Sequence, residues 1–481
     1  MKAAAGRPVI TPDSPDRQYS TRLRTALVLT GTGTAGAYHA GVLRALHEAG
    51  VRIDLVAGRG VGVIGAMFAA VDGGQRLWDT GGLWKDPAVT RSYGWRLPLR
   101  VAGWALVAAT GLLATPLLLL AGGVAAGLIG LVLWSASLTR AAGALRSAYG
   151  RWLDALLDPS VLPTIVPRLI VLCLLAAVLT LAVSVAAAAF RAPVRRRARQ
   201  GQFWRLFGAP LTSAVLLDRV TTDLWNLIRG AAPIAAPPSA ELGRKYIELL
   251  AENLGQPGFR ELLLIAHDMD ARRDLVFALL KEPQRGRFFG RPVLEGRSGE
   301  AFDLAGVGRQ YAFDALASSL TLPIATEPHL IRFAPEGPWR GETHRVCDRP
   351  GSLGRLLEEV AVAGAEQVIV LSAAPLPARP HELSSGRGDL RGRAGEQIGA
   401  FEGAALRDAL EQTGLRFATI FVIRPPHNPL TPLDFAGVDD ERSDRRYSLA
   451  ELVDRGYEDA YRQFIEPVVA GTGDRIERVQ S

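Results

Sequence analysis

The stretch LVLTGTGTAGAYHAGVLRALHEAGVRIDLVAGRGVGVIGAMFAA, residues 27–70, decides how this chain folds. It begins with an apolar run, passes through a glycine-rich turn over residues 31–36, and continues into a segment with helical spacing that stops at Gly50. This order is typical of a strand, a turn and an amphipathic helix. The turn therefore presents backbone N–H groups at the start of a helix, a place that suits negatively charged oxygen.

The end of the same stretch has the spacing of a second sharp turn. Gly58, Gly60 and Gly62 match the G-x-S-x-G pattern in which some hydrolases mount a nucleophilic serine between a strand and a helix. The middle position is a glycine, which has no side chain to act as a nucleophile. Because glycine tolerates the strained backbone of such a turn, we expect the fold to persist without that chemistry.

The glycine spacing also allows a second interpretation. Gly31, Gly33 and Gly36 satisfy G-x-G-x-x-G, the turn of dinucleotide-binding folds, which requires an acidic residue at the end of the next strand. Asp54 lies at about the right distance but precedes the apolar run LVAG instead of ending it. A nucleotide-binding membrane protein is therefore the less favoured alternative.

Composition favours a membrane protein over a nucleic-acid-binding protein. The 481 residues are 48% hydrophobic and carry a net charge of +7, with a mean hydropathy of +0.14. The arginines cluster beside apolar runs, so we expect membrane lipid and no nucleic acid as a partner. Two cysteines imply neither a disulfide framework nor a metal site, and we expect no cofactor. Residues 1–24 are interpreted as a flexible tail.

Two uncharged runs predict transmembrane helices, one within residues 101–139 and one within 169–190. The first run has 39 residues, which as one helix would extend about 58 Å, roughly twice the thickness of the hydrocarbon core. It is either one span with a bend near Pro116 or a hairpin that turns at Gly122 and Gly123. We favour two crossings in total, because a third would place the parts before and after the insertion on opposite sides of the membrane.

Arginines at the outer flanks of the two runs predict the orientation. Under the positive-inside rule these flanks stay in the cytoplasm, and the less basic link between Arg140 and Arg168 lies on the other side. We therefore expect a multi-pass membrane protein whose globular domain faces the cytoplasm. The flanking residues are Arg91, Arg96, Arg100, Arg191, Arg195, Arg196, Arg197 and Arg199.

Further segments, taken with residues 27–70, resemble the patatin-like phospholipase family in the expected order. They are ELLLIAHDMDARRDLVFAL (261–279), ALASSLTLP (315–323), VCDRP (346–350), LGRLLEEVAVAGAEQVIVLSA (353–373), FVIRP (421–425), PLDF (432–435) and SLAELVDRGYEDA (448–460). The resemblance implies an α/β fold, a patatin-like three-layer α/β/α sandwich interrupted here by a transmembrane helical insertion. The implied division is a first part over 25–91, the insertion over 92–205 and a second part over 206–470.

The resemblance also implies a Ser-Asp dyad without histidine, in which loop N–H groups stabilise the oxyanion. The nucleophile position corresponds to Gly60, in an elbow that contains Gly58 and Gly62, and the acid position corresponds to Asp348. The oxyanion loop corresponds to Gly31, Thr32, Gly33 and Gly36.

Several positions depart from the family pattern. Besides Gly60, Thr32 replaces a glycine of the loop, Ala35 stands where a basic residue is common, and Arg349 and Pro350 replace two glycines. We therefore expect a catalytically impaired homologue of a lipid acyl hydrolase that binds lipid or a protein partner at the membrane.

The alternative is an active phospholipase or esterase with a non-standard nucleophile. Its candidate hydroxyls are Thr30, Thr32, Thr34, Ser318 and Ser319. His39 and His267 are expected to be structural. Residues 380–398 are polar and glycine-rich and predict a loop.

Overall fold

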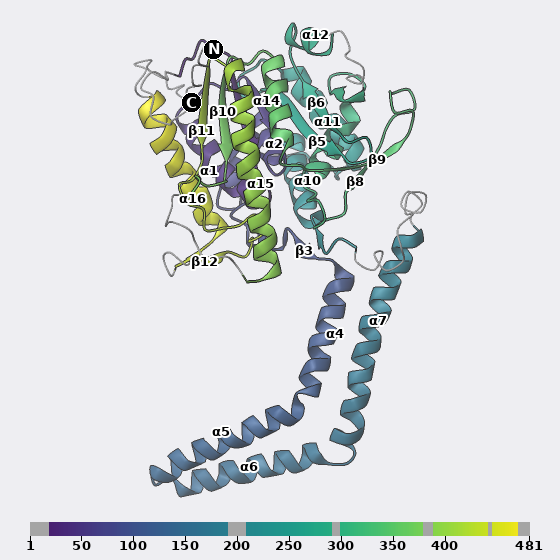
Figure 1. Ribbon diagram of the computed structural model, residues 1–481, viewed down its shortest axis with the longest axis vertical. Coiled ribbons are helices and arrows are strands. Elements are labelled where there is room, and N and C mark those ends of the chain that lie inside the picture. The colour runs from purple at the N-terminus through teal and green to yellow at the C-terminus, as the bar shows by residue number, and fades with distance from the viewer. Residues whose placement is uncertain (1–18, 191–207, 291–298, 379–387, 441–444, 470–481) are drawn as a thin grey trace, which may run out of the picture. The chain divides into compact units, whose positions relative to one another are not determined.

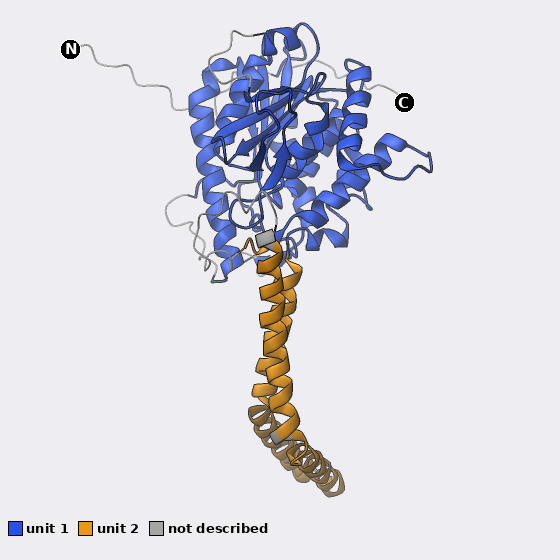
Figure 2. Ribbon diagram, turned by 90° about the vertical axis from the view of Figure 1, so that its right-hand side faces the viewer, with its two compact units in different colours: residues 1–94, 211–481 blue, residues 95–210 orange. Residues whose placement is uncertain are grey.

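The computed structural model describes residues 19–190, 208–290, 299–378, 388–440 and 445–469. Two compact units share the chain, one ending at Gly94 and resuming at Leu211, the other running from Trp95 to Pro210 (Figure 2). The boundaries predicted for the insertion were residues 92 and 205.

A nine-stranded sheet forms the centre of the first unit (Figure 1). Its order is β11-β10-β1-β2-β5-β6-β7, in which β11 to β5 are parallel and β6 runs antiparallel to β5, while β9 pairs with the end of β5 and with β8. The strands are β1 (Thr25–Thr30), β2 (Leu55–Gly58), β5 (Glu261–Asp268), β6 (Arg273–Leu279), β7 (Ala301–Asp303), β8 (His329–Arg332), β9 (Thr343–Cys347), β10 (Gln367–Ser372) and β11 (Thr419–Ile423).

Helices cover both faces of this sheet, and the helices of the first unit are α1 (Ala35–Glu48), α2 (Gly62–Ala70), α3 (Gln75–Trp78), α10 (Ala214–Arg229), α11 (Ser239–Asn253), α12 (Gln284–Phe289), α13 (Ala312–Ser319), α14 (Ser352–Val362), α15 (Leu390–Thr413) and α16 (Leu449–Ala460). The smaller elements are β3 (Gly94–Trp95), β4 (Leu211–Thr212), β12 (Val438–Asp440), β13 (Arg445–Tyr447), the π-helix η6 (Tyr461–Val469), and the 3-10 turns η1 (Pro87–Arg91), η4 (Arg309–Tyr311) and η5 (Gly414–Arg416).

The core has two layers, one on each face of the sheet, because successive side chains of a strand point to opposite faces. Leu27 and Leu29 of β1 pack with α1, α2, α11 and α16, whereas Ala26 and Val28 of the same strand pack with α14 and α15. In a parallel sheet that is covered on both faces, the sequence of each strand is a nearly continuous apolar run, and the sequence of β1 has this form. The predicted three-layer α/β/α fold is confirmed.

The second unit consists of α4 (Leu97–Leu113), α5 (Thr115–Ser135), α6 (Thr139–Leu157), the short π-helix η2 (Val161–Ile165) and α7 (Val166–Phe190). Residues 115–135 and 166–187 are long and apolar enough to cross a membrane, judged by length and composition. The 39-residue uncharged run is broken just before Pro116, where one of our two alternatives placed a bend, and α5 continues through Gly122 and Gly123 without a turn.

Two expectations differ from the structure in detail. Tyr19 is buried against Phe464, so the part of the predicted tail that is described, residues 19–24, belongs to the fold. The polar segment predicted as a loop over 380–398 becomes helical at Leu390, because Asp389 caps α15 by accepting a hydrogen bond from Gly392 N–H. The link between Arg140 and Arg168 is mostly helix α6. Residues 1–18, the arginines at 191–199 and residues 379–387 lie outside the described residues.

Candidate active site

The glycine loop and the elbow lie side by side at the carboxyl ends of β1 and β2. Arg59 N–H donates to Leu29 O at 3.1 Å and Val61 N–H donates to Gly31 O at 2.9 Å, so the loop and the elbow are joined through the backbone. Gly60 stands at the apex of the elbow with φ +56°, a conformation that side chains other than glycine adopt at a cost. The sequence-predicted elbow is therefore present as a sharp turn between β2 and α2.

The glycines of the loop allow close contacts between elements. Gly33 has φ +57°, and a Cβ built there would lie 1.9 Å from Pro432 O. A Cβ at Gly36 would meet the ring of Trp84 at 2.1 Å. In the elbow, a Cβ at Gly62 would lie 2.2 Å from Leu29 O, and one at Gly58 would lie 2.8 Å from Gly62 O. These positions need glycine for packing, whatever the chemistry of the site.

Asp348 lies opposite Gly60, in the loop between β9 and α14. A Cβ built at Gly60 would lie 2.9 Å from Asp348 Oδ2 and 2.3 Å from Gly31 O. Asp348 is 2% exposed, and its backbone N–H donates to Thr321 O at 3.0 Å. The structure thus brings together the three places that the family resemblance selected, although Gly60 leaves its place without a functional group.

Arg59 supplies the side chain that faces Asp348 instead. It is completely buried, and its five N–H groups point at three partners. Nε and Nη2 donate to Asp348 at 3.1 and 2.5 Å, Nη1 and Nη2 donate to Glu402 at 2.5 and 2.9 Å, and Nη1 donates to Thr30 Oγ1 at 3.0 Å. Both carboxylate oxygens of Asp348 therefore accept hydrogen bonds from a guanidinium.

Glu402 reaches this cluster from the middle of α15 and is 5% exposed. Its Oε1 accepts a hydrogen bond from Thr32 Oγ1 at 2.6 Å, and Thr32 Oγ1 also lies 3.4 Å from Asp348 Oδ2. Sequence reasoning missed both Arg59 and Glu402. A charged residue inside the apolar stretch LVAGRGVGVIG was a usable signal for Arg59, whereas nothing near Glu402 in the sequence marks it.

The cluster carries two carboxylates for one guanidinium, and this imbalance affects their protonation. Burial raises the pKa of the Asp348 carboxyl above its usual range; the Arg59 guanidinium opposes that shift and Glu402 adds to it. Burial acts to lower the pKa of Arg59, but the two carboxylates outweigh it and raise that pKa. Arg59 therefore stays charged.

The other sequence candidates have different surroundings. Of the five hydroxyls considered as substitute nucleophiles, that of Thr32 lies within hydrogen-bond distance of Asp348. Thr30 Oγ1 accepts from Arg59, Thr34 Oγ1 donates to Thr431 O at 3.0 Å, and Ser319 Oγ donates to Ile265 O at 3.3 Å. Ser318 is completely buried, and its Oγ has no hydrogen-bond partner among the described residues.

The two histidines occupy structural positions. His39 is buried with Nε2 3.2 Å from Thr30 O, and burial lowers its pKa to about 4. His267 Nδ1 lies 2.8 Å from Asp274 Oδ1, at the hairpin of β5 and β6.

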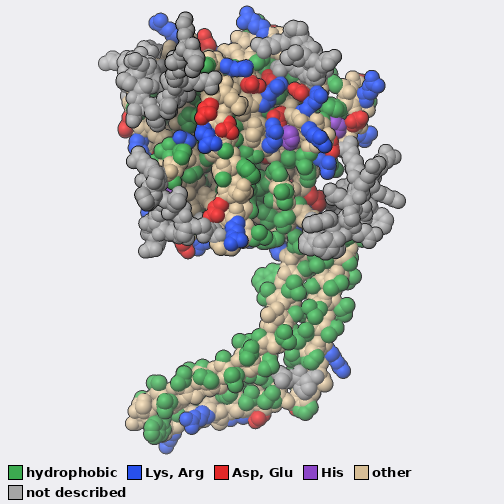
Figure 3. Space-filling model, viewed as in Figure 1, with side chains coloured by type: hydrophobic (Ala, Val, Ile, Leu, Met, Phe, Trp, Pro, Cys, Tyr) green, Lys and Arg blue, Asp and Glu red, His purple; other side chains and the backbone are tan. Residues whose placement is uncertain are grey.

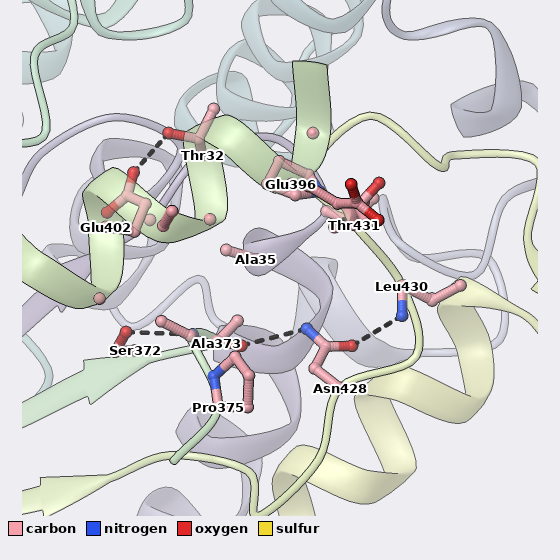
Figure 4. Close-up of a pocket in the computed structure, with 18 of the residues that line it drawn as sticks. Thr32, Ala35, Ser372, Ala373, Pro375, Glu396, Glu402, Asn428, Leu430 and Thr431 are labelled. Carbon is pink, nitrogen blue, oxygen red and sulfur yellow. Dashed lines mark hydrogen bonds between the residues drawn. The ribbon is translucent and has the colours of Figure 1, made fainter. Parts of the chain in front are cut away.

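A pocket of about 430 Å³ opens next to Thr32 and Glu402 (Figure 4). One wall is the glycine loop, another is the face of α15 that carries Gly395, Gly399 and Gly403, and the remainder is mostly alanine, proline and leucine. A Cβ built at Gly399 or Gly403 would meet nothing within 4 Å, so these two glycines border open space, whereas a Cβ at Gly395 would lie 2.5 Å from Thr431 Oγ1. The pocket is predominantly apolar, and the buried Thr32 and Glu402 are among its polar groups, the usual composition of a small-molecule site.

The arrangement does not suit a dinucleotide. Asp54 Oδ2 accepts a hydrogen bond from Thr25 N–H at 2.9 Å. Asp54 therefore lies at the amino end of β1, whereas the glycine loop follows the carboxyl end of the same strand. Among the described residues, no group of three or more His, Cys, Asp or Glu side chains is arranged to hold a metal ion.

Comparison with known proteins gives three findings. A family profile described as "Patatin-like phospholipase" matches residues 27–342, more than half of the chain. Proteins called patatin-like phospholipase domain-containing protein 6 from Mus musculus, Pongo abelii and Homo sapiens are 58% identical over 45 residues, 9% of this chain and 3% of each relative. The solved structure of VipD from Legionella pneumophila aligns with a TM-score of 0.29 and 12% identity, over 93% of this chain and 68% of that one.

Proposed function

Because this chain belongs to the patatin-like phospholipase family, we propose that it is a membrane-anchored member that binds lipid and has lost acyl hydrolysis. The proposal depends on the observed state of the dyad positions. The nucleophile position is Gly60, and the carboxylate of Asp348 accepts hydrogen bonds from the guanidinium of Arg59.

The loss of chemistry follows from the reaction itself. Acyl transfer by a Ser-Asp dyad needs a hydroxyl that attacks the ester carbonyl and a carboxylate that accepts the hydroxyl proton. Glycine supplies no hydroxyl, so no acyl-enzyme forms at Gly60. Asp348 is also engaged elsewhere, since both oxygens of its carboxylate already accept hydrogen bonds from Arg59 instead of facing an attacking hydroxyl. Two changes thus disable the same step.

Lipid binding is supported by the pocket beside the glycine loop. Its apolar wall of small residues suits an acyl chain, and the hydroxyl of Thr32, which also lines the pocket, bonds to Glu402 of the polar cluster. We assign the chemical class of the ligand as a lipid with at least one acyl chain. Besides the glycine loop, the walls come from residues 372–377, α15 and the segment 427–432, none of which takes part in the dyad.

Membrane anchoring is supported by α5 and α7, which are long and apolar enough to cross a bilayer. Arg96 and Arg100 near the start of α4 favour a globular unit on the cytoplasmic side. Fractionation of cells that express the full chain tests this part: recovery in the supernatant after a carbonate wash contradicts an integral protein.

Lipid binding is tested by mass spectrometry of lipids that remain with the full-length protein after mild detergent extraction. Gly399→Phe and Gly403→Phe each direct a ring into the pocket from a position where a side chain meets no obstacle. Arg407→Phe, at an exposed position of the same helix, is the matched control. We expect the wild type and the control to retain an acyl lipid and the pocket variants to lose it. Equal lipid content in all four proteins contradicts the proposal.

One observation favours a second candidate function, an active acyl hydrolase in which Thr32 is the nucleophile. Thr32 Oγ1 donates to Glu402 at 2.6 Å, and both residues line the pocket. Glu402 would accept the proton of the attacking hydroxyl, but both of its carboxylate oxygens already accept hydrogen bonds from Arg59.

A fluorophosphonate probe separates the two functions. The non-catalytic proposal predicts no labelling of the wild type. Labelling that persists in Thr32→Ser and disappears in Thr32→Val, a variant of nearly the same shape, would instead establish the hydrolase.

A further inference from the structure

The helices of the second unit form two antiparallel pairs. α4 packs along α7, and α5 packs along α6 (Figure 1). The two helices that pass the length and composition test for a membrane span, α5 and α7, therefore belong to different pairs. A simple hairpin of α5 and α7 across the bilayer is not the arrangement in the structure.

The partner of α5 is unsuited to cross a membrane. α6 carries Arg140, Arg146, Arg151 and Asp154, and each such charge at the centre of a bilayer costs about 2.5–3.5 kcal/mol even by the lower estimates. The partner of α7 carries one charge, Arg100, within its first turns and is otherwise apolar. Of the two pairs, α4 and α7 are the one that can span the hydrocarbon core.

The contact between α5 and α6 is specific. The hydroxyl of Tyr149 donates to Leu119 O at 2.5 Å, and its ring lies against Gly122 and Gly123, where a Cβ would come within 3.5 and 3.1 Å of Tyr149 atoms. The two glycines therefore serve close helix packing. At the connecting turn Ser137 adopts φ +61° and Leu138 N–H donates to Leu133 O at 2.9 Å, which ends α5 sharply.

One face of α6 gathers polar side chains, whereas Arg146 points toward α5, where a Cβ built at Gly130 would lie 3.5 Å from its Nε. At 100° per residue, Arg140, Ser147 and Arg151 of α6 point within about 20° of one direction, opposite to Tyr149. α5 has no polar face, and most of its leucines and valines, among them Leu117, Leu120 and Val132, are exposed in the isolated unit; Figure 3 shows many hydrophobic side chains on the surface of this unit. Such a pair matches the boundary between hydrocarbon and lipid headgroups, with the arginines toward phosphate.

We propose that α4 and α7 cross the bilayer and that the α5–α6 hairpin lies in the plane of the interface on the far side, with the arginine face of α6 on lipid phosphates. This proposal rests on the membrane anchoring proposed above. α4 is about 25 Å long and α7 about 38 Å, against a hydrocarbon core of about 30 Å. The break before Pro116 and the π-helix η2 allow the chain to change direction where each pair meets the next.

Depth measurements along α5 test the proposal. In the full chain with Cys173→Ala and Cys347→Ala, single cysteines at successive positions of α5 and α7 carry spin labels, and the protein is placed in phosphatidylcholine–phosphatidylglycerol vesicles. Relative access of oxygen and of a polar nickel reagent reports depth. For α7 we expect depth to rise toward the bilayer centre and fall again, a change of about 15 Å. For α5 we expect no trend, only an oscillation with a period of about 3.6 residues.

Three outcomes contradict the inference, and they are distinguishable. A rise and fall of depth along α5 like that along α7 shows that α5 crosses the membrane, which refutes the interfacial hairpin and leaves the anchoring intact. Labels on α7 that remain fully accessible to the nickel reagent refute the anchoring itself. A cysteine at Ser147, on the polar face of α6, serves as the reference for an exposed position, and a buried label there also contradicts the inference.

Discussion

Restoring a serine at position 60 is the sharpest test of how far the site has departed from its family. Gly60→Ser supplies the missing hydroxyl, but the new Cβ would lie 2.3 Å from Gly31 O and 2.9 Å from Asp348 Oδ2. A left-handed conformation costs a residue other than glycine about 1–2 kcal/mol. Overpacking of this severity adds about 1–3 kcal/mol. We therefore expect the free energy of unfolding to fall by about 2–5 kcal/mol.

The same variant is expected to remain inactive. Its hydroxyl would face an Asp348 whose two oxygens already accept hydrogen bonds from Arg59, so proton transfer to the carboxylate is disfavoured. Gly60→Ala has the same Cβ without the hydroxyl and is the matched control. We expect both variants to unfold at similar temperatures, several degrees below the wild type, and to hydrolyse esters equally poorly.

The assay combines thermal unfolding followed by tryptophan fluorescence in detergent with hydrolysis of a p-nitrophenyl ester and labelling by a fluorophosphonate. The reasoning is refuted if Gly60→Ser unfolds at the wild-type temperature and is labelled at residue 60 while Gly60→Ala is not. That result would mean that Arg59 moves away from Asp348 at little cost and that the remaining machinery is intact.

Five other substitutions test the packing and charges in the first unit. Arg59→Met leaves two buried carboxylates, those of Asp348 and Glu402, without their guanidinium and should lower the free energy of unfolding by about 3–5 kcal/mol. Glu402→Gln keeps one carboxylate paired with Arg59 and should lower it by less. Denaturant unfolding measures both losses, and a larger loss for Glu402→Gln contradicts the role of Arg59 in balancing the two carboxylates. Because burial lowers the pKa of His39 to about 4, its neutral ring contributes stability that is present above pH 6.5 and is lost as the pH falls toward 4, up to about 3 kcal/mol. The unfolding temperature of His39→Gln should therefore depend less on pH between 7 and 4.5 than that of the wild type, and parallel curves would show that another group is responsible. Gly41→Ala places a Cβ 1.8 Å from Val453 O, between α1 and α16, and should destabilise the protein. Gly403→Ala on α15 meets open space and should be neutral or stabilising by up to about 1 kcal/mol. Thermal unfolding of both variants tests this difference, and a Gly41→Ala variant as stable as the wild type contradicts the close packing of α1 against α16.

The sequence alone determined the fold class, the glycine turns and the apolar helices. Residues 27–70 predict two strand–turn–helix units, and the structure has β1 with α1 and β2 with α2 at those places. These features are local, because glycine spacing and apolar periodicity are written within about twenty consecutive residues. The absence of a side chain at Gly60 is likewise visible without any coordinates.

Only the tertiary structure decided what Arg59 contacts and which helices of the insertion pair. Arg59 meets partners 289 and 343 positions away, Asp348 and Glu402, and no local pattern encodes such a distant partner. The apolar composition of α5 likewise indicates that the helix avoids water, yet it does not distinguish burial in lipid from packing against α6. The pairing depends on the fit of the Tyr149 ring against Gly122 and Gly123, a property of two surfaces in contact that neither helix shows by itself.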